Sequence, residues 1–136
     1  MNSTMADSGT LTPSMQFGGL MQFLREDVSA APILSPKRFS QALHIDLQTL
    51  AGQAHVHRNT ISRAPESESV QRFLREAVRV LRAAMDINKD VPSAIFWYRN
   101  EPLPPFAYKT AEQLVVDGRS DDVLRYVASL EAGAAG

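Results

Sequence analysis

The sequence contains no cysteine among its 136 residues. This absence excludes a disulfide framework, a thiolate nucleophile and a thiolate metal site. No apolar run approaches the roughly 20 residues that a membrane-spanning helix needs. Residues 1–14 lack the Lys/Arg cluster and apolar core of a signal peptide. We therefore expect a cytoplasmic protein with no membrane partner.

Sequence signatures of catalysis are missing as well. There is no glycine-rich phosphate loop, no nucleophile elbow and no His–Glu motif of a metalloprotease helix. His55 and His57, with His44 nearby, resemble a metal site in composition, but no Asp, Glu or Cys stands beside them at ligand spacing. The paired acids Asp121 and Asp122 are explained by a helix start. We expect no enzyme activity, no cofactor and no metal.

The charge that is present is unevenly distributed. Residues 35–82 carry eight Lys/Arg against four Asp/Glu, a net +4, although the whole chain has a net charge of −1. The flanking segments are acidic: residues 83–136 carry five bases against eight acids, and residues 1–34 carry one base against three acids. A basic middle is what a nucleic-acid contact confined to one segment would leave.

Helix signals recur from Ser35 onward, and we expect an all-α fold with no strand. Ser35, Asp46, Ser67 and Ser120 are suitable N-caps, and Thr110 with a Gln three residues later forms a capping box. The longest apolar stripe with helical periodicity follows Ser67. We expect a flexible leader at 1–31 with one short helix near 20–27, a helix-turn-helix domain with a long connecting helix at 32–85, and a helical C-terminal domain at 86–136.

Residues 46–63 have the pattern of a DNA-binding helix-turn-helix, in which the second of two short helices enters the major groove. Apolar and small residues stand where the two helices must touch, and the second helix is short and polar. The turn position that is most often glycine is His55, which can adopt left-handed backbone angles at some cost. The expected DNA-binding residues are His57, Arg58, Asn59, Thr60, Ser62 and Arg63.

Two basic features also have a simpler explanation. The polar face of residues 57–63 could be the ordinary outer face of an amphipathic bundle. Four arginines on the long helix could contact phosphates, but we favour a solvated face or a protein interface, because this helix is separate from the recognition unit. These arginines are Arg72, Arg75, Arg79 and Arg82.

The last third of the chain carries a recognisable order of motifs. Residues 97–106 (WYRNEPLPPF), 109–115 (KTAEQLV), 117–119 (DGR) and 122–126 (DVLRY) closely resemble the toxin-binding domain of the Xre/MbcA/ParS antitoxins. The resemblance covers about residues 35–133, because that family also has an upstream helix-turn-helix. The chain departs from the family at His55, at residues 106–108, where many members have a glycine pair, and in its long leader.

The resemblance implies a type II antitoxin that blocks a NAD-consuming toxin of the RES type and represses its own operon by binding operator DNA. It also implies self-association as a homodimer or in a larger complex with toxin. Trp97 and Phe106 are expected in the core. Capping is the favoured explanation for Thr110 and Gly118. The residues matched to the toxin-binding motif are Lys109, Thr110, Gly118, Arg119, Arg125 and Tyr126.

Two other functions stay open at this point. The chain could be a stand-alone transcriptional regulator that uses its C-terminal domain only for dimerisation. It could also be a protein-interaction adaptor whose helix-turn-helix no longer binds DNA, a possibility that His55 keeps open.

Overall fold

The computed structural model describes residues 16–26 and 32–135, and these are mostly helical, as the sequence predicts. One small exception is a pair of two-residue strands, β1 (Arg25–Glu26) and β2 (Ile33–Leu34), which pair antiparallel with Arg25 opposite Leu34. The prediction of no strand was wrong at this point. Strands this short carry no alternating apolar pattern, so the sequence offers no signal for them.

The N-terminal half of the fold contains four short helices that precede the long one. They are α1 (Phe17–Leu24), α2 (Pro36–Leu43), α3 (Leu47–Gln53) and α4 (Arg58–Arg63). Two of them begin at predicted caps: the Ser35 hydroxyl accepts from the Arg38 amide at 3.1 Å, and the Asp46 carboxylate accepts from the Thr49 amide at 2.7 Å. These bonds satisfy amides that have no partner within the helix.

Helix α1 belongs to the folded unit, and it overlaps the one short helix that the sequence predicted within the leader at 1–31. Leu20 and Leu24 are each 1% exposed and join the core. Arg38 donates to the carbonyls of Phe23 and Arg25, which fastens the end of α1 to α2. The helix also starts three residues earlier than the predicted range. The remaining residues of the expected leader, 1–15 and 27–31, lie outside the described part.

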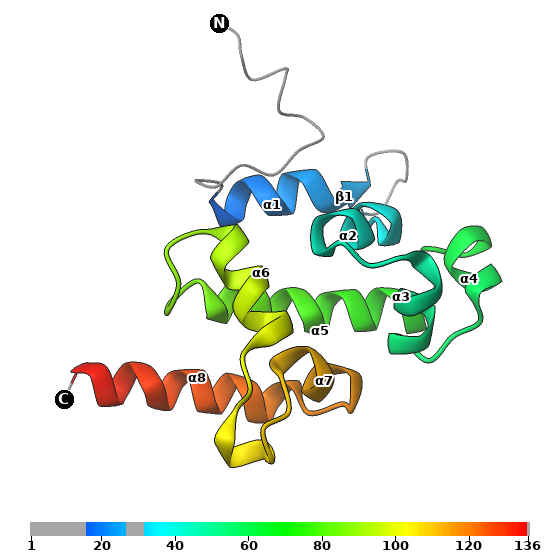
Figure 1. Cartoon of the computed structure of the whole chain (residues 1–136). Helices are drawn as coiled ribbons and strands as arrows, with labels where there is room; N and C mark the ends of the chain where they lie inside the picture. Colours follow the sequence, from blue (N-terminus) through cyan, green and yellow to red (C-terminus); the bar gives the residue numbers. More distant parts are fainter. Residues whose placement is uncertain (1–15, 27–31, 136) are drawn as a thin grey trace, which may run out of the picture.

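Helix α5 (Glu68–Ala84) runs through the middle of the molecule, with α1 and α2 on one side and α7 and α8 on the other (Figure 1). Its apolar stripe is buried as the periodicity predicts. Val70, Leu74 and Ala77 are each at most 1% exposed. Helix α5 contacts α2, α6, α7, α8 and β2, so one amphipathic helix organises the core.

The C-terminal half completes the same core. It contains α6 (Val91–Asn100), the 3₁₀ turn η2 (Pro104–Phe106), α7 (Ala111–Val116) and α8 (Ser120–Ala135). The buried apolar residues form one cluster that extends from Leu20 to Val127. Trp97 and Phe106 pack against this cluster but are only partly buried, whereas Tyr98 is fully buried. The reason is helical phase: Val91, Ile95 and Tyr98 recur on the inner face of α6, and Trp97 does not.

Candidate functional site

The turn between α3 and α4 has the hydrogen bonds of a Schellman C-cap. The His55 amide donates to Gly52 O at 3.2 Å, and the Val56 amide donates to Ala51 O at 3.0 Å. His55 has φ 59°, the left-handed conformation that this cap requires and that glycine usually supplies. The turn therefore forms with histidine in place of glycine, as the sequence allowed. This arrangement fixes the angle at which α4 leaves α3.

The His55 ring makes a contact that glycine at this position could not make. Its Nε2 lies 3.0 Å from the carbonyl oxygen of Val116, at the end of α7. Because a carbonyl can only accept, Nε2 carries the proton and donates. A glycine here would relieve backbone strain but would lose this bond between the α3–α4 turn and α7.

The other two histidines of the chain also stand at helix ends. His44 has φ 59° and caps the C-terminus of α2, while His57 is the N-cap of α4, with Nδ1 accepting from the Asn59 amide at 3.2 Å. Within the described residues, no group of three metal-ligating side chains lies together. The three histidines thus have separate roles in helix capping and in the contact with α7.

The structure brings the six expected DNA-binding residues together on α4 and its cap. Ile61 is 4% exposed and anchors the helix to the core, while the polar positions face outward, with Thr60 partly buried. Among the described residues, neither Arg58 nor Arg63 has an acidic partner at ion-pair distance. Helix α4 is therefore an exposed basic surface with unpaired guanidinium groups.

The carboxyl of Asp46, the N-cap of α3, lies close enough to Arg58 to respond to its charge. Hydrogen bonds from Thr49, together with the positive charge of Arg58, lower the pKa of this carboxyl.

The arginines of α5, by contrast, have partners within the fold. Arg72 and Arg75 both lie near the Glu68 carboxylate, and Arg79 pairs with Glu76 at 2.8 Å. Arg82 lies over the Phe17 ring, 5.7 Å from its centroid. These contacts favour the interpretation of this stripe as a solvated face whose positive charge is partly neutralised.

Two residues of the predicted toxin-binding set cap helix α7. The Thr110 side chain accepts from the Gln113 amide at 3.1 Å, and Gln113 accepts from the Thr110 amide at 2.9 Å. Gly118 has φ 79°, and its neighbour Arg119 donates its amide to Leu114 O at 2.8 Å. The capping interpretation of Thr110 and Gly118 is thus confirmed.

The other members of this set gather around Phe106 and Asp122. The Arg119 guanidinium lies 5.2 Å from the Phe106 ring centroid, and the Tyr126 ring meets Phe106 edge-on at 5.8 Å. Arg119 and Arg125 both pair with the Asp122 carboxylate. Hydrogen bonding and charge from these arginines lower the pKa of Asp122. We define this cluster, made of Phe106, Arg119, Asp122, Arg125 and Tyr126, as the C-terminal surface. Lys109 follows Phe106 by three positions and pairs with Asp117 at 2.8 Å.

The loop that leads into α7 is a tight turn with two left-handed residues in succession. Ala107 has φ 57° and Tyr108 has φ 64°, and the Lys109 amide closes the turn by donating to Phe106 O at 3.1 Å. This is the pattern of a type I′ turn, for which Asn-Gly is the preferred sequence. Leu103 and Lys109 pair across its base. Each left-handed non-glycine residue costs roughly 1–2 kcal/mol.

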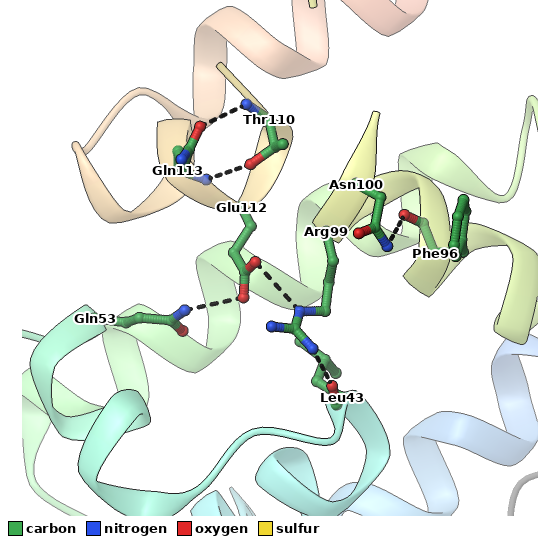
Figure 2. Close-up of polar contacts among 8 residues, drawn as sticks. All are labelled: Leu43, Gln53, Phe96, Arg99, Asn100, Thr110, Glu112 and Gln113. Carbon is green, nitrogen blue, oxygen red and sulfur yellow. Dashed lines mark hydrogen bonds and ion pairs between the residues drawn. The ribbon is translucent and has the colours of Figure 1, made fainter. Parts of the chain in front are cut away.

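A buried carboxylate joins the two parts of the chain, and no local sequence signal points to it. Glu112 on α7 is 8% exposed; it accepts from Gln53 on α3 at 2.9 Å and from Arg99 on α6 at 3.3 Å (Figure 2). Arg99 also donates to Leu43 O at 2.7 Å. We call these residues the Glu112 junction. The residues of each contact lie far apart in sequence, up to 59 positions, so spacing cannot reveal them.

The Tyr98 hydroxyl is buried near this junction and has no hydrogen-bond partner among the described residues. Burial raises the pKa of Tyr98 well above its ordinary value, and the Glu112 charge raises it further. The phenol is therefore neutral and serves as part of the core.

Comparison of the chain with protein-family models, with curated proteins and with solved structures gives no match. The resemblance to antitoxins rests on the quoted motifs alone. In the part of the chain that the structure describes, no helix has the length and apolar content needed to cross a membrane.

Proposed function

We propose that this chain is the antitoxin of a type II toxin–antitoxin pair. It binds a NAD-consuming toxin of the RES type through the C-terminal surface and represses its own operon through α4. The observation that carries the proposal is the placement of the two motif-bearing surfaces at separate edges of one fold. Helix α4 and the loop containing Pro104–Phe106 lie apart, with α5 and α7 between them (Figure 1).

The exposed face of α4 supports operator binding. Arg58 and Arg63 are exposed and unpaired among the described residues, so neither must give up an ion pair to reach DNA. Arginine pairs with guanine O6 and N7, asparagine with adenine, and serine or threonine with phosphate oxygens. A six-residue helix reaches few base pairs, so operator recognition requires two copies of the chain, as a homodimer or within a larger complex with toxin.

The composition of the C-terminal surface supports protein binding. Aromatic residues and arginine are enriched at protein interfaces, and this surface combines Phe106 and Tyr126 with Arg119 and Arg125. The Arg125 side chain is 73% exposed although it pairs with Asp122. The chain acts here by binding, and its effect on the toxin is to block access to the toxin's own active site.

The proposal predicts that a gene for a RES-type protein lies beside the gene of this chain, and it is tested by co-expression of the two proteins. We expect the RES-type protein to arrest growth when expressed alone and growth to resume when the chain is also expressed. Arrest that persists despite soluble expression of the chain would exclude the antitoxin function. The function of a stand-alone transcriptional regulator would then remain as the alternative, because that function requires operator binding but no rescue of growth.

A separate prediction addresses α4. Arg58→Ala and Arg63→Ala should each weaken binding to DNA from the operon's own promoter roughly tenfold or more, because each removes a base or phosphate contact. Electrophoretic mobility shift at fixed salt measures the loss. Arg75→Ala is the matched control, since Arg75 pairs with Glu68 on α5 and its loss should change binding less than twofold. All three variants should still rescue growth; failure of rescue by the α4 variants would indicate a folding defect or a wrong assignment.

A further inference from the structure

The type I′ turn before α7 presents one large side chain to solvent. Tyr108 is 67% exposed and occupies the second left-handed position of the turn. Its backbone is held firmly, because its amide donates to Leu103 O at 3.0 Å and the next amide closes the turn. The backbone of Tyr108 is thus held in place by the turn, while its ring is exposed to solvent.

The Tyr108 side chain has no polar or aromatic partner in the described part of the fold. No hydrogen bond or ring contact of this side chain is present among the described residues. A left-handed position favours glycine or asparagine, and an aromatic residue there raises the free energy of the folded state. Strain of this kind persists where surrounding structure enforces it, and it is concentrated at functional positions.

The turn adjoins the C-terminal surface. Phe106 precedes the two left-handed residues and contacts both Arg119 and Tyr126. Lys109 follows them and pairs with Asp117. Tyr108 therefore stands between two residues that are tied to the surface proposed to bind toxin.

We propose that Tyr108 is the anchor of the toxin interface, inserting its ring into an apolar pocket of the toxin that has a hydrogen-bond acceptor for the hydroxyl. This inference rests on the proposed function. Tyrosine is enriched among the residues that dominate binding energy, and it combines a large apolar area with one polar group. A rigid turn lowers the ordering cost of binding. The cations Lys109, Arg119 and Arg125 are paired with Asp117 and Asp122, so the surface around the anchor offers charges of both signs, as the polar rim of a protein interface does.

Replacement of Tyr108 by glycine gives a test in which binding and stability change in opposite directions. Glycine removes the ring and also suits the left-handed backbone. Tyr108→Gly should therefore raise the thermal unfolding midpoint while weakening affinity for the purified RES-type protein at least about tenfold. Tyr108→Phe should lose less affinity, because it keeps the ring. Affinity is measured by titration calorimetry and stability by circular dichroism.

Phe96→Ala is the matched control, because Phe96 is also an aromatic residue with 67% exposure but lies on α6. Its loss should leave affinity within about twofold. If the unmodified chain binds the toxin and Tyr108→Gly binds equally well, the anchor is excluded while the antitoxin function stands. Equal weakening by Phe96→Ala would also overturn the anchor. If the unmodified chain does not bind the toxin, the proposed function fails and the anchor with it.

Discussion

At the scale of single residues, the left-handed backbone positions show how histidine and glycine can fill the same capping role. His55 takes the position where glycine is usual, and its ring reaches Val116 O at 3.0 Å. The side chain thus offsets part of the strain that the backbone imposes. Gly118, at φ 79°, performs the same capping role at the end of α7 without a side-chain contact.

A pair of substitutions separates these two contributions at His55. Both His55→Ala and His55→Gly remove the ring contact, but only glycine adopts the left-handed conformation without strain. His55→Gly should therefore be more stable than His55→Ala by about 1 kcal/mol. Urea denaturation measures the difference. Equal stability of the two variants would show that position 55 does not hold the left-handed conformation in solution.

At the scale of elements, local sequence signals predict where several helices begin. The way in which the helices contact one another depends on residues that lie far apart in the sequence. Ser35, Asp46 and Thr110 act as caps at the predicted places, because a cap depends only on residues within one turn. Ser67 stands at the N-cap of α5, but its hydroxyl has no hydrogen-bond partner among the described residues, and Ser120 is the first residue of α8. The six DNA-binding candidates lie together for the same reason, since one short helix carries them. The Gln53–Glu112 contact joins residues 59 positions apart, so no local pattern could predict it. The pairing of Arg25 with Leu34 was missed because each strand is too short to carry an alternating apolar pattern.

Helix α4 should depend on a single buried side chain. A helix of six residues is too short to persist alone in water, and Ile61 is its buried residue, at 4% exposure. Ile61→Ala should therefore cost about 2–5 kcal/mol and increase amide hydrogen exchange across α4 above all. Ser62→Ala, at the neighbouring exposed position, should change stability by less than about 0.5 kcal/mol. Undisturbed exchange in α4 of Ile61→Ala would show that other contacts hold the helix.

At the scale of the whole molecule, the Glu112 junction adds polar contacts to the apolar core that joins the two halves of the fold. Gln53, Glu112 and Arg99 connect α3, α7 and α6, and the Arg99 contact to Leu43 O extends the connection to the end of α2. The His55 contact to Val116 lies at the other end of α7. Hydrogen bonds are directional, so these polar contacts restrict the orientation of the helices in addition to their apolar packing.

Glu112→Gln should destabilise the fold by about 1–3 kcal/mol, because it weakens a hydrogen-bonded ion pair whose carboxylate is mostly buried. The matched control is Glu76→Gln, which alters the more exposed pair with Arg79 and should cost less than about 1 kcal/mol. Chemical denaturation of the two variants gives the comparison. Equal costs would show that the junction contributes no more than an ordinary surface pair.

The Glu112 junction also constrains how the two proposed ligands affect each other. Glu112 follows the Thr110 cap on α7, and its partner Gln53 is the last residue of α3. If toxin bound to the C-terminal surface shifts α7 and thereby tilts α4, the affinity of the chain for operator DNA changes by a measurable factor. Thermodynamic reciprocity then requires bound operator to change toxin affinity by the same factor. Measuring either coupling fixes the other, and Glu112→Gln should reduce both together.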